Sequence, residues 1–334
     1  MTLQEIYELA IEMGIKADPR GKDGVKRFLA RTKKEYDEMP KKKKQYFDEE
    51  SFRNPYSDSR ILFGDPKIKV KKLMAGIDAG VADLLLLDRL NHPSTHSTGS
   101  GQAGSGLGLN LLISHHPTGY ALASLHEVMD IQIDMFEEAG IPPNVAHALF
   151  EERKGAVKRR IDPRNHGQDI DAARLLNIPF LSLHTIWDNL GNQFMKNYLG
   201  KKKFYTVGEI LDEINKLPEF IEATKGKAGP SILSGSEKSR AGKIFISFTG
   251  GTNPSKELYM EMAKAGVGTV VDMHIPEEAL QEVKKLHINV INTGHMASDS
   301  IGANIFLEEL EKRGVKVIPC SGLIRVKRMK DLKT

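Results

Sequence analysis

The chain has 334 residues, of which 40% are hydrophobic and 28% charged, as is typical of a globular protein with a large core. Its single cysteine, Cys320, excludes an intrachain disulfide and a cysteine-rich zinc module, and makes a cytoplasmic location the default expectation. The formal net charge of +4 is below the basic excess of a dedicated nucleic-acid binder, and neither a signal peptide nor a membrane-spanning run is expected.

Residues 1–57 are predicted to form an N-terminal helical extension. Thr2 and Glu5 have the spacing of a capping box, and the apolar residues that follow fall on one helical stripe. The extension could dock on the core, mediate assembly or present a basic surface, and the sequence leaves these roles open. The lysine run at 41–44 is interpreted as a solvated face in preference to a nucleic-acid contact.

From about residue 59, apolar runs alternate with amphipathic segments, which predicts an α/β fold with mostly parallel or mixed sheets flanked by helices. Strands are expected at 73–77, 109–113, 180–183, 244–248, 268–271, 290–292 and 315–318. Helices are expected at 81–90, 122–139, 170–176, 207–226, 256–264, 277–286 and 300–313. A further strand is predicted at 144–148 and a loop at 227–240.

Two glycine-bearing segments are candidates for ligand loops. The Gly/Ser-rich segment 93–106 contains a G-x-G-x-x-G pattern, but it precedes a strand and opens no helix, so dinucleotide binding is rejected. The segment 249–254, TGGTNP, follows a predicted strand and precedes a helix. Its backbone N–H groups could bind an anion, and a plain tight turn is an equally good interpretation.

Three histidine-bearing segments end predicted strands, which is the most informative feature of the chain. His115 and His116 stand together before Pro117, while His184 and His295 are each followed four residues later by an aspartate, Asp188 and Asp299. The ends of parallel strands converge on one crevice, and side chains four apart on a helix share a face. Imidazole and carboxylate groups meeting there predict a site for one or two divalent metal ions.

Each segment also has a structural interpretation. Neighbouring residues of a regular strand point to opposite faces, so His115 and His116 share a site only if the backbone turns there. His184 could be a satisfied histidine at a strand end, and Asp299 could be the N-cap of the following helix. Asp272, which ends a further predicted strand, and the nearby His274 belong either to the outer part of the site or to the surface.

A pair of divalent ions would give these residues a chemical role. Two such ions about 3.5–4 Å apart need a bridging carboxylate or water to offset their repulsion. A water between two cations loses a proton readily and becomes a nucleophile near neutral pH. An aspartate between two histidine clusters suits the bridging task.

The three segments resemble the motifs of a known family. The run LISHHP at 112–117 resembles the THHP signature of the dinuclear metal centre hexameric proteins, also called NGG-interacting-factor-like and often labelled type-two GTP cyclohydrolase I. HTIWD at 184–188 resembles the family's HTNLD segment, and GHMASD at 294–299 resembles its GHYxTE segment. The similarity extends from about residue 61 to 326, and residues 1–57 are expected to fall outside the common core.

The resemblance implies two α/β lobes, the first built from both ends of the core. Residues 58–195 with 290–334 would form the metal-binding lobe, and residues 196–289 the second lobe. It also implies a toroidal homo-hexamer whose metal sites face the inner cavity. The usual family member has Glu where this chain has Asp299, so one ion could be held less tightly or through water.

The resemblance further implies two divalent ions per chain, with zinc, iron or manganese most expected. Their ligands would be His115, His116, Asp188, His295 and Asp299, with His184 nearby as a proton carrier. The expected function is a metal-dependent hydrolase acting on a nucleotide such as GTP, with no membrane partner and only weak support for a nucleic-acid partner. The alternative is a metal-stabilised hexameric scaffold or regulatory binding protein without turnover.

Overall fold

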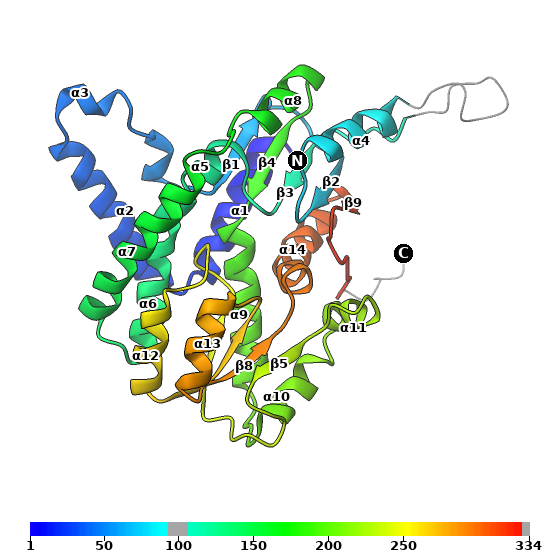
Figure 1. Ribbon diagram of the computed structural model, residues 1–334. Helices are drawn as coiled ribbons and strands as arrows, with labels where there is room; N and C mark the ends of the chain where they lie inside the picture. Colours follow the sequence, from blue (N-terminus) through cyan, green and yellow to red (C-terminus); the bar gives the residue numbers. More distant parts are fainter. Residues whose placement is uncertain (93–105, 329–334) are drawn as a thin grey trace.

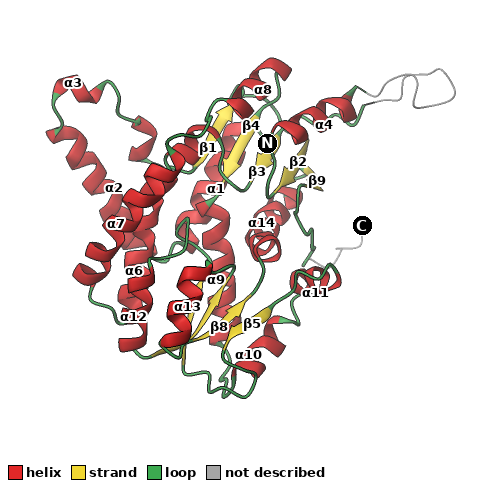
Figure 2. Cartoon of the chain, in the orientation of Figure 1, coloured by secondary structure: helices red, strands yellow, loops and turns green. Residues whose placement is uncertain are grey.

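The computed structural model describes residues 1–92 and 106–328, so most of the Gly/Ser-rich segment 93–106 lies outside the described residues. Two separate sheets are joined by helices that run between them, as Figure 1 shows for α9 (Thr185–Gly200) and α14 (His295–Lys312). Figure 2 shows the two sheets in yellow, with helices covering them. The predicted α/β class is confirmed.

The first sheet has the strand order β1-β4-β3-β2-β9, and only β1 runs antiparallel to its neighbour. The second has the order β5-β8-β7-β6, again with one antiparallel edge strand, β5. Both are therefore mixed sheets. The strands of the first sheet are β1 (Ser59–Phe63), β2 (Lys72–Gly76), β3 (Leu112–Ser114), β4 (Phe180–Leu183) and β9 (Lys316–Cys320). Those of the second are β5 (Ser231–Ser234), β6 (Lys243–Ser247), β7 (Val267–Asp272) and β8 (Asn289–Asn292).

The helices of the first half are α1 (Leu3–Ala17), α2 (Gly21–Glu38), α3 (Lys41–Lys44), α4 (Val81–Asn91), α5 (Gly119–Ala123), α6 (Ile131–Glu138), α7 (Pro143–Ile161) and α8 (Gln168–Leu176). Besides α9 and α14, the second half has α10 (Val207–Ile214), α11 (Pro218–Lys225), α12 (Lys256–Lys264) and α13 (Glu277–Lys285). The 3-10 helices are η1 (Glu49–Phe52) and η3 (Leu125–Asp130). Across residues 1–92 and 106–328, no helix has both the length and the apolar character needed to cross a membrane.

The N-terminal extension docks on the core through its first helix. The predicted capping box between Thr2 and Glu5 is present at the start of α1. On the apolar stripe of this helix, Leu3, Ile6, Tyr7 and Ala10 are buried and Met13 is half-buried, and α1 packs against α9. The helices α2 and α3 instead project from the body (Figure 1), and the lysines of α3 lie largely in solvent.

The chain crosses between the sheets twice, once through α9 and once through α14. These helices approach so closely that a Cβ atom on Gly302 would lie 1.9 Å from the carbonyl oxygen of Trp187. Since β8 pairs within the second sheet, the chain returns to the first sheet only after Asn292. The predicted lobe boundaries at residues 58, 196 and 290 stay a prediction.

Five local predictions differ from the structure, and one of them is the helix expected at 207–226, which is divided into α10 and α11 by the turn before Pro218. The strand expected at 144–148 is wrong, because Pro143 opens α7 and the buried residues along that helix follow a helical spacing. The predicted loop at 227–240 contains β5, a short edge strand. The helix expected at 122–139 is divided among α5, η3 and α6, and the last helix begins at His295 instead of residue 300.

Candidate metal centre

The two neighbouring histidines lie just beyond the end of β3. The backbone N–H groups of His115 and His116 donate to the carbonyls of Gly76 and Ile77, each at 2.9 Å, so the pairing with the segment of β2 continues past the strand. The two imidazoles lie in the same cluster, with ring centroids 5.2 Å apart. His115 is fully buried and stacks on Trp187 at 5.5 Å with an interplanar angle of 8°.

Three ligand atoms form the first candidate triad. His116 Nε2 lies 3.2 Å from His295 Nε2 and 3.3 Å from Asp299 Oδ2, and the last two atoms are 3.4 Å apart. Ligand atoms bonded to one ion at 2.0–2.2 Å, at tetrahedral or octahedral angles, are about 3.0–3.5 Å from each other. The triad therefore has the dimensions of a metal site.

A second candidate triad lies beside the first. His115 Nε2 is 3.3 Å from Asp188 Oδ1 and 3.6 Å from Asp299 Oδ1. His184 flanks this triad, with Nε2 3.8 Å from Asp188 Oδ2. Asp299 thus presents one carboxylate oxygen to each triad, which is the arrangement of a bridging carboxylate.

Three buried atoms at the centre have no hydrogen-bond partners. The second triad is closed to solvent, whereas His116 and His295 of the first triad are partly exposed. His115 Nε2 and both carboxylate oxygens of Asp299 are buried without a hydrogen-bond partner. His115 Nδ1 lies 3.1 Å from the carbonyl oxygen of Leu183 and donates to it, so Nε2 is the ring atom that faces the carboxylates. Orphaned buried polar atoms are costly, and a bound cation would satisfy all three. These residues could therefore hold a metal ion.

The structure brings together all six residues predicted for the site and excludes one alternative. Asp299 is not an N-cap, because Gly294 occupies that position and Asp299 lies within α14. His184 is the N-cap residue of α9, and Asp188 lies in its first turn. Their roles as ligands and proton carrier stay predictions.

Two supporting carboxylates were missed. Asp58, fully buried just before β1, accepts hydrogen bonds from His184 Nδ1 at 2.8 Å and from Thr185 Oγ1 at 2.7 Å. Asp78 lies 2.5 Å from His116 Nδ1. Carboxylates of this kind fix the tautomer and orientation of a metal-binding histidine. The one signal in the sequence is the position of Asp78 just past a predicted strand, and nothing points to Asp58.

The charges at the centre are strongly coupled. Burial alone would raise the pKa of Asp299, but the surrounding imidazoles, led by that of His115, outweigh it and hold the pKa well below its usual range. Burial lowers the pKa of His295 to about 4, so this imidazole is neutral at neutral pH. Burial would also lower the pKa of His115, but the carboxylate of Asp299 overcomes it and raises the pKa above 6.5. Metal binding there must therefore release a proton.

A small cavity of about 40 Å³ lies beside the triads, at the ends of β6 and β7. His184, Asp188 and His295 line it together with His274 and residues of the segment 249–253. The TGGT segment considered above as an anion loop thus faces the candidate metal centre. Asp272, which also lines the cavity, is fully enclosed, and burial raises its pKa to about 7.

Fold and site together define a class: α/β proteins with two mixed sheets and a buried histidine–aspartate cluster between them. In sequence, neither a family model nor a curated protein matches the chain. Among solved structures, the chain is similar to a NIF3 superfamily protein from Sphaerobacter thermophilus, with a TM-score of 0.73 and 26% identity over 97% of this chain and 99% of that one. The resemblance to the NIF3-like family that the three motifs predict is therefore confirmed.

Two further solved structures are more distant. Reduced HcgD from Methanocaldococcus jannaschii has a TM-score of 0.49 and 13% identity, covering 78% of this chain and 89% of that one. TTHA1606 from Thermus thermophilus has a TM-score of 0.43 and 13% identity, covering 81% and 89%. The 97% coverage by the Sphaerobacter protein leaves few residues over, so most of residues 1–57 have a counterpart there. The expectation that they fall outside a common core does not hold for that protein.

Proposed function

We propose that the protein is a hydrolase that depends on two divalent metal ions and opens a C–N bond in a nucleotide such as GTP. The observation that carries the proposal is the pair of triads sharing Asp299, whose two carboxylate oxygens are buried without hydrogen-bond partners. His115 and Asp188 would hold one ion with Asp299, and His116 and His295 the other. A pair of such ions supplies a water of lowered pKa and stabilises negative charge that develops during hydrolysis.

His184 is proposed as the proton carrier. Its Nδ1 faces the buried carboxylate of Asp58 at 2.8 Å, which keeps that nitrogen protonated and fixes the ring. Its Nε2 is therefore the atom that exchanges protons, and His184 lines the small cavity beside the triads. In the proposed reaction, Nε2 takes the proton of the attacking water and delivers it to the leaving nitrogen.

The assembly and partners are proposed on the family resemblance. We propose a cytoplasmic, toroidal homo-hexamer whose metal centres face the inner cavity. A nucleotide or another phosphorylated small molecule would enter from that cavity. The TGGT segment at 249–252 supports a phosphorylated substrate, because it lines the space beside the candidate ligands.

The test begins with metal content, measured by plasma mass spectrometry on protein purified without chelator or a nickel column. Two equivalents of one metal per chain are expected. The loaded protein is then screened for hydrolysis of GTP and other nucleotides. In Asp188→Ala, turnover should be lost while the hexamer persists in sedimentation. Intact turnover in that variant would exclude the mechanism. Two bound ions with no turnover on any nucleotide would favour the scaffold alternative.

A further inference from the structure

A second, larger cavity lies at the edge of the second sheet, at the opposite end of α9 from the metal centre. It has a volume of about 580 Å³, within the usual range for small-molecule sites. Its walls are the C-terminal ends of α6 and α9, the segment 202–205 and the edge strand β6. The 16 residues of α9 span about 24 Å at 1.5 Å per residue, so the two sites are separate.

The lining combines apolar side chains with lysines. Leu199, Phe204 and Ile244 are among its apolar groups, and Lys203 and Lys243 are among its cations. The Lys243 ammonium donates to the carbonyl oxygen of Ala139 at 2.6 Å and has no carboxylate partner in the part of the chain that the structure describes. Within the same ranges Lys203 has no polar partner at all.

The other charges of the lining are already neutralised. Among the lining residues that the structure describes, Glu138 is the only acid, and it pairs with Lys196 at 2.6 Å. Lys202 pairs with Glu213, which lies outside the cavity. Two cationic groups are therefore left over beside an apolar surface. The complementary ligand has an apolar body and a negative charge.

The sheet edge in this cavity is closed off at both ends. Before β6, the Ala241 N–H donates to the carbonyl of Tyr205, and Thr206 forms a bridge with Arg240. After it, the Phe248 N–H donates to Asn192 Oδ1 at 3.3 Å. Only the five residues of β6 are open, so the hollow is bounded at both ends and suits a small molecule better than an extended peptide.

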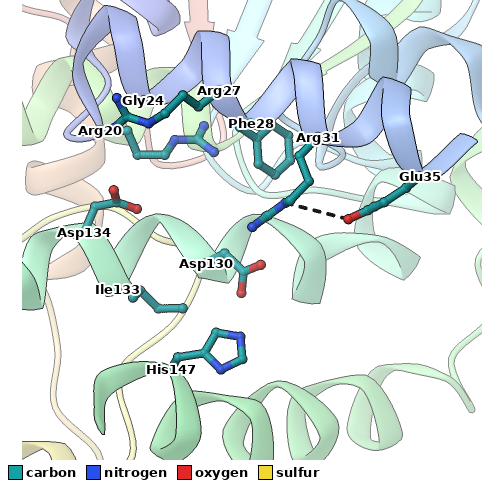
Figure 3. A pocket seen from close by; sticks show the side chains of 10 residues that line it. All are labelled: Arg20, Gly24, Arg27, Phe28, Arg31, Glu35, Asp130, Ile133, Asp134 and His147. Carbon is teal, nitrogen blue, oxygen red and sulfur yellow. Dashed lines mark ion pairs between the residues drawn. The ribbon is translucent and has the colours of Figure 1, made fainter. Parts of the chain in front are cut away.

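Another pocket of similar volume lacks this charge imbalance. About 570 Å³ is enclosed between α2 and the helices that follow η3, as seen in Figure 3. Arginines of α2 line one wall, but carboxylates such as Asp130 and Asp134 stand across from them, and Arg31 pairs with Glu35 at 3.7 Å. Opposite charges in one pocket do not select a ligand of either sign.

We propose that the cavity beside β6 is a binding site for an organic anion with an apolar body, such as an aryl or alkyl carboxylate or sulfonate. Lys203 and Lys243 bind the anionic group, and Phe204 and Ile244 contact the apolar body. The site is independent of the proposed hydrolase activity. Both α9 and β6 extend from this cavity to the candidate metal centre. Ser247, at the end of β6, lines the small cavity beside the two triads.

A matched pair of fluorescent probes tests the proposal on the full chain. 8-Anilinonaphthalene-1-sulfonate carries the anion, and N-phenyl-1-naphthylamine has the same apolar body without it. The sulfonate should bind at least tenfold more tightly than the neutral amine. In the double variant Lys203→Met/Lys243→Met this preference should fall below twofold, whereas Phe204→Ala should weaken both probes. The control Lys26→Met, on exposed α2, should behave as the parent protein.

Three outcomes would overturn the proposal. The first is equal affinity of the two probes for the parent protein. The second is an unchanged preference in the double lysine variant, provided that circular dichroism and melting temperature show a native fold. The third is a change of oligomeric state in Phe204→Glu by sedimentation velocity, which would make this face an interface between copies of the chain.

Discussion

Replacing Asp299 by alanine should remove both metal ions, whereas replacing either His295 or Asp188 should remove only one. The reason is the shared carboxylate: Asp299 Oδ2 completes the triad of His116 and His295, and Oδ1 lies 3.6 Å from His115 in the other. His295 and Asp188 each belong to a single triad. A count of bound ions therefore distinguishes a bridging aspartate from an ordinary ligand.

The same difference should appear in stability. A site filled at an ion concentration of 100 times its Kd stabilises the folded chain by about 2.7 kcal/mol, so two independent sites contribute about 5 kcal/mol. Asp299→Ala should lose this whole metal-dependent increment, and His295→Ala about half of it. The increment is the difference between unfolding free energies with and without added metal, which removes any effect of the substitution on the metal-free fold.

The assay combines plasma mass spectrometry after dialysis with urea unfolding at two metal concentrations. His147→Ala is the matched control, because this exposed histidine lies on α7 away from the centre. The reasoning is refuted if His295→Ala and Asp299→Ala retain the same number of ions. It is also refuted if Asp299→Ala keeps one ion at the parent affinity.

Three further predictions concern the surroundings of the site. Asp58→Asn should leave both ions bound but lower turnover. It should also lower the free energy of unfolding in urea by about 1–3 kcal/mol, because a buried charged acceptor of two hydrogen bonds is lost. Unchanged stability would contradict this prediction. Asp272 has a pKa of about 7 in the folded protein and of 3.8 in the unfolded chain, so the folded state holds the extra proton between these two pH values. The free energy of unfolding should therefore fall by about 4 kcal/mol as the pH rises from 3.8 to 7. Urea unfolding of Asp272→Asn should show a flatter dependence on pH. Gly302→Ala would press a methyl group onto the Trp187 carbonyl and should lower the free energy of unfolding by at least about 1–3 kcal/mol. Gly200→Ala is the matched control, because it has open space around it and should leave the stability nearly unchanged.

The sequence predicts the elements with a strong local pattern. The capping box at Thr2 and the strand over 180–183 are found where expected, because a cap or an apolar run specifies each of them. The strand β5 was missed, since four residues with two terminal serines and only half-buried apolar groups resemble a loop. The segment 144–148 was misassigned, because five residues do not separate a strand from the first turns of a helix.

The candidate site was predicted for a similar reason. His115, His116 and His184 follow β3 and β4, which are neighbours in the first sheet, so local patterns were enough for them. The sequence predicts that the three histidine segments meet at the strand ends of one sheet, but His295 follows β8 of the second sheet and joins the cluster through α14. Asp58 was not predictable, because its contact with His184 joins positions 126 residues apart and follows no motif. Nor could the sequence divide two oxygens of Asp299 between two triads, since that depends on the packing of α14 against α9.

The route of the chain through the metal centre has a consequence for how the molecule unfolds. The ligands come from the end of β3 in the first sheet, from α9 as it leaves that sheet, and from α14 as it leaves the second. An ion bound by all three segments would link the two sheets at both of the helices that cross between them, α9 and α14. The loaded protein is then expected to unfold in one cooperative transition. Removal of the ions is expected to lower the midpoint of that transition without dividing it, because one apolar core extends from Leu73 and Ile113 of the first sheet to Val270 and Val290 of the second.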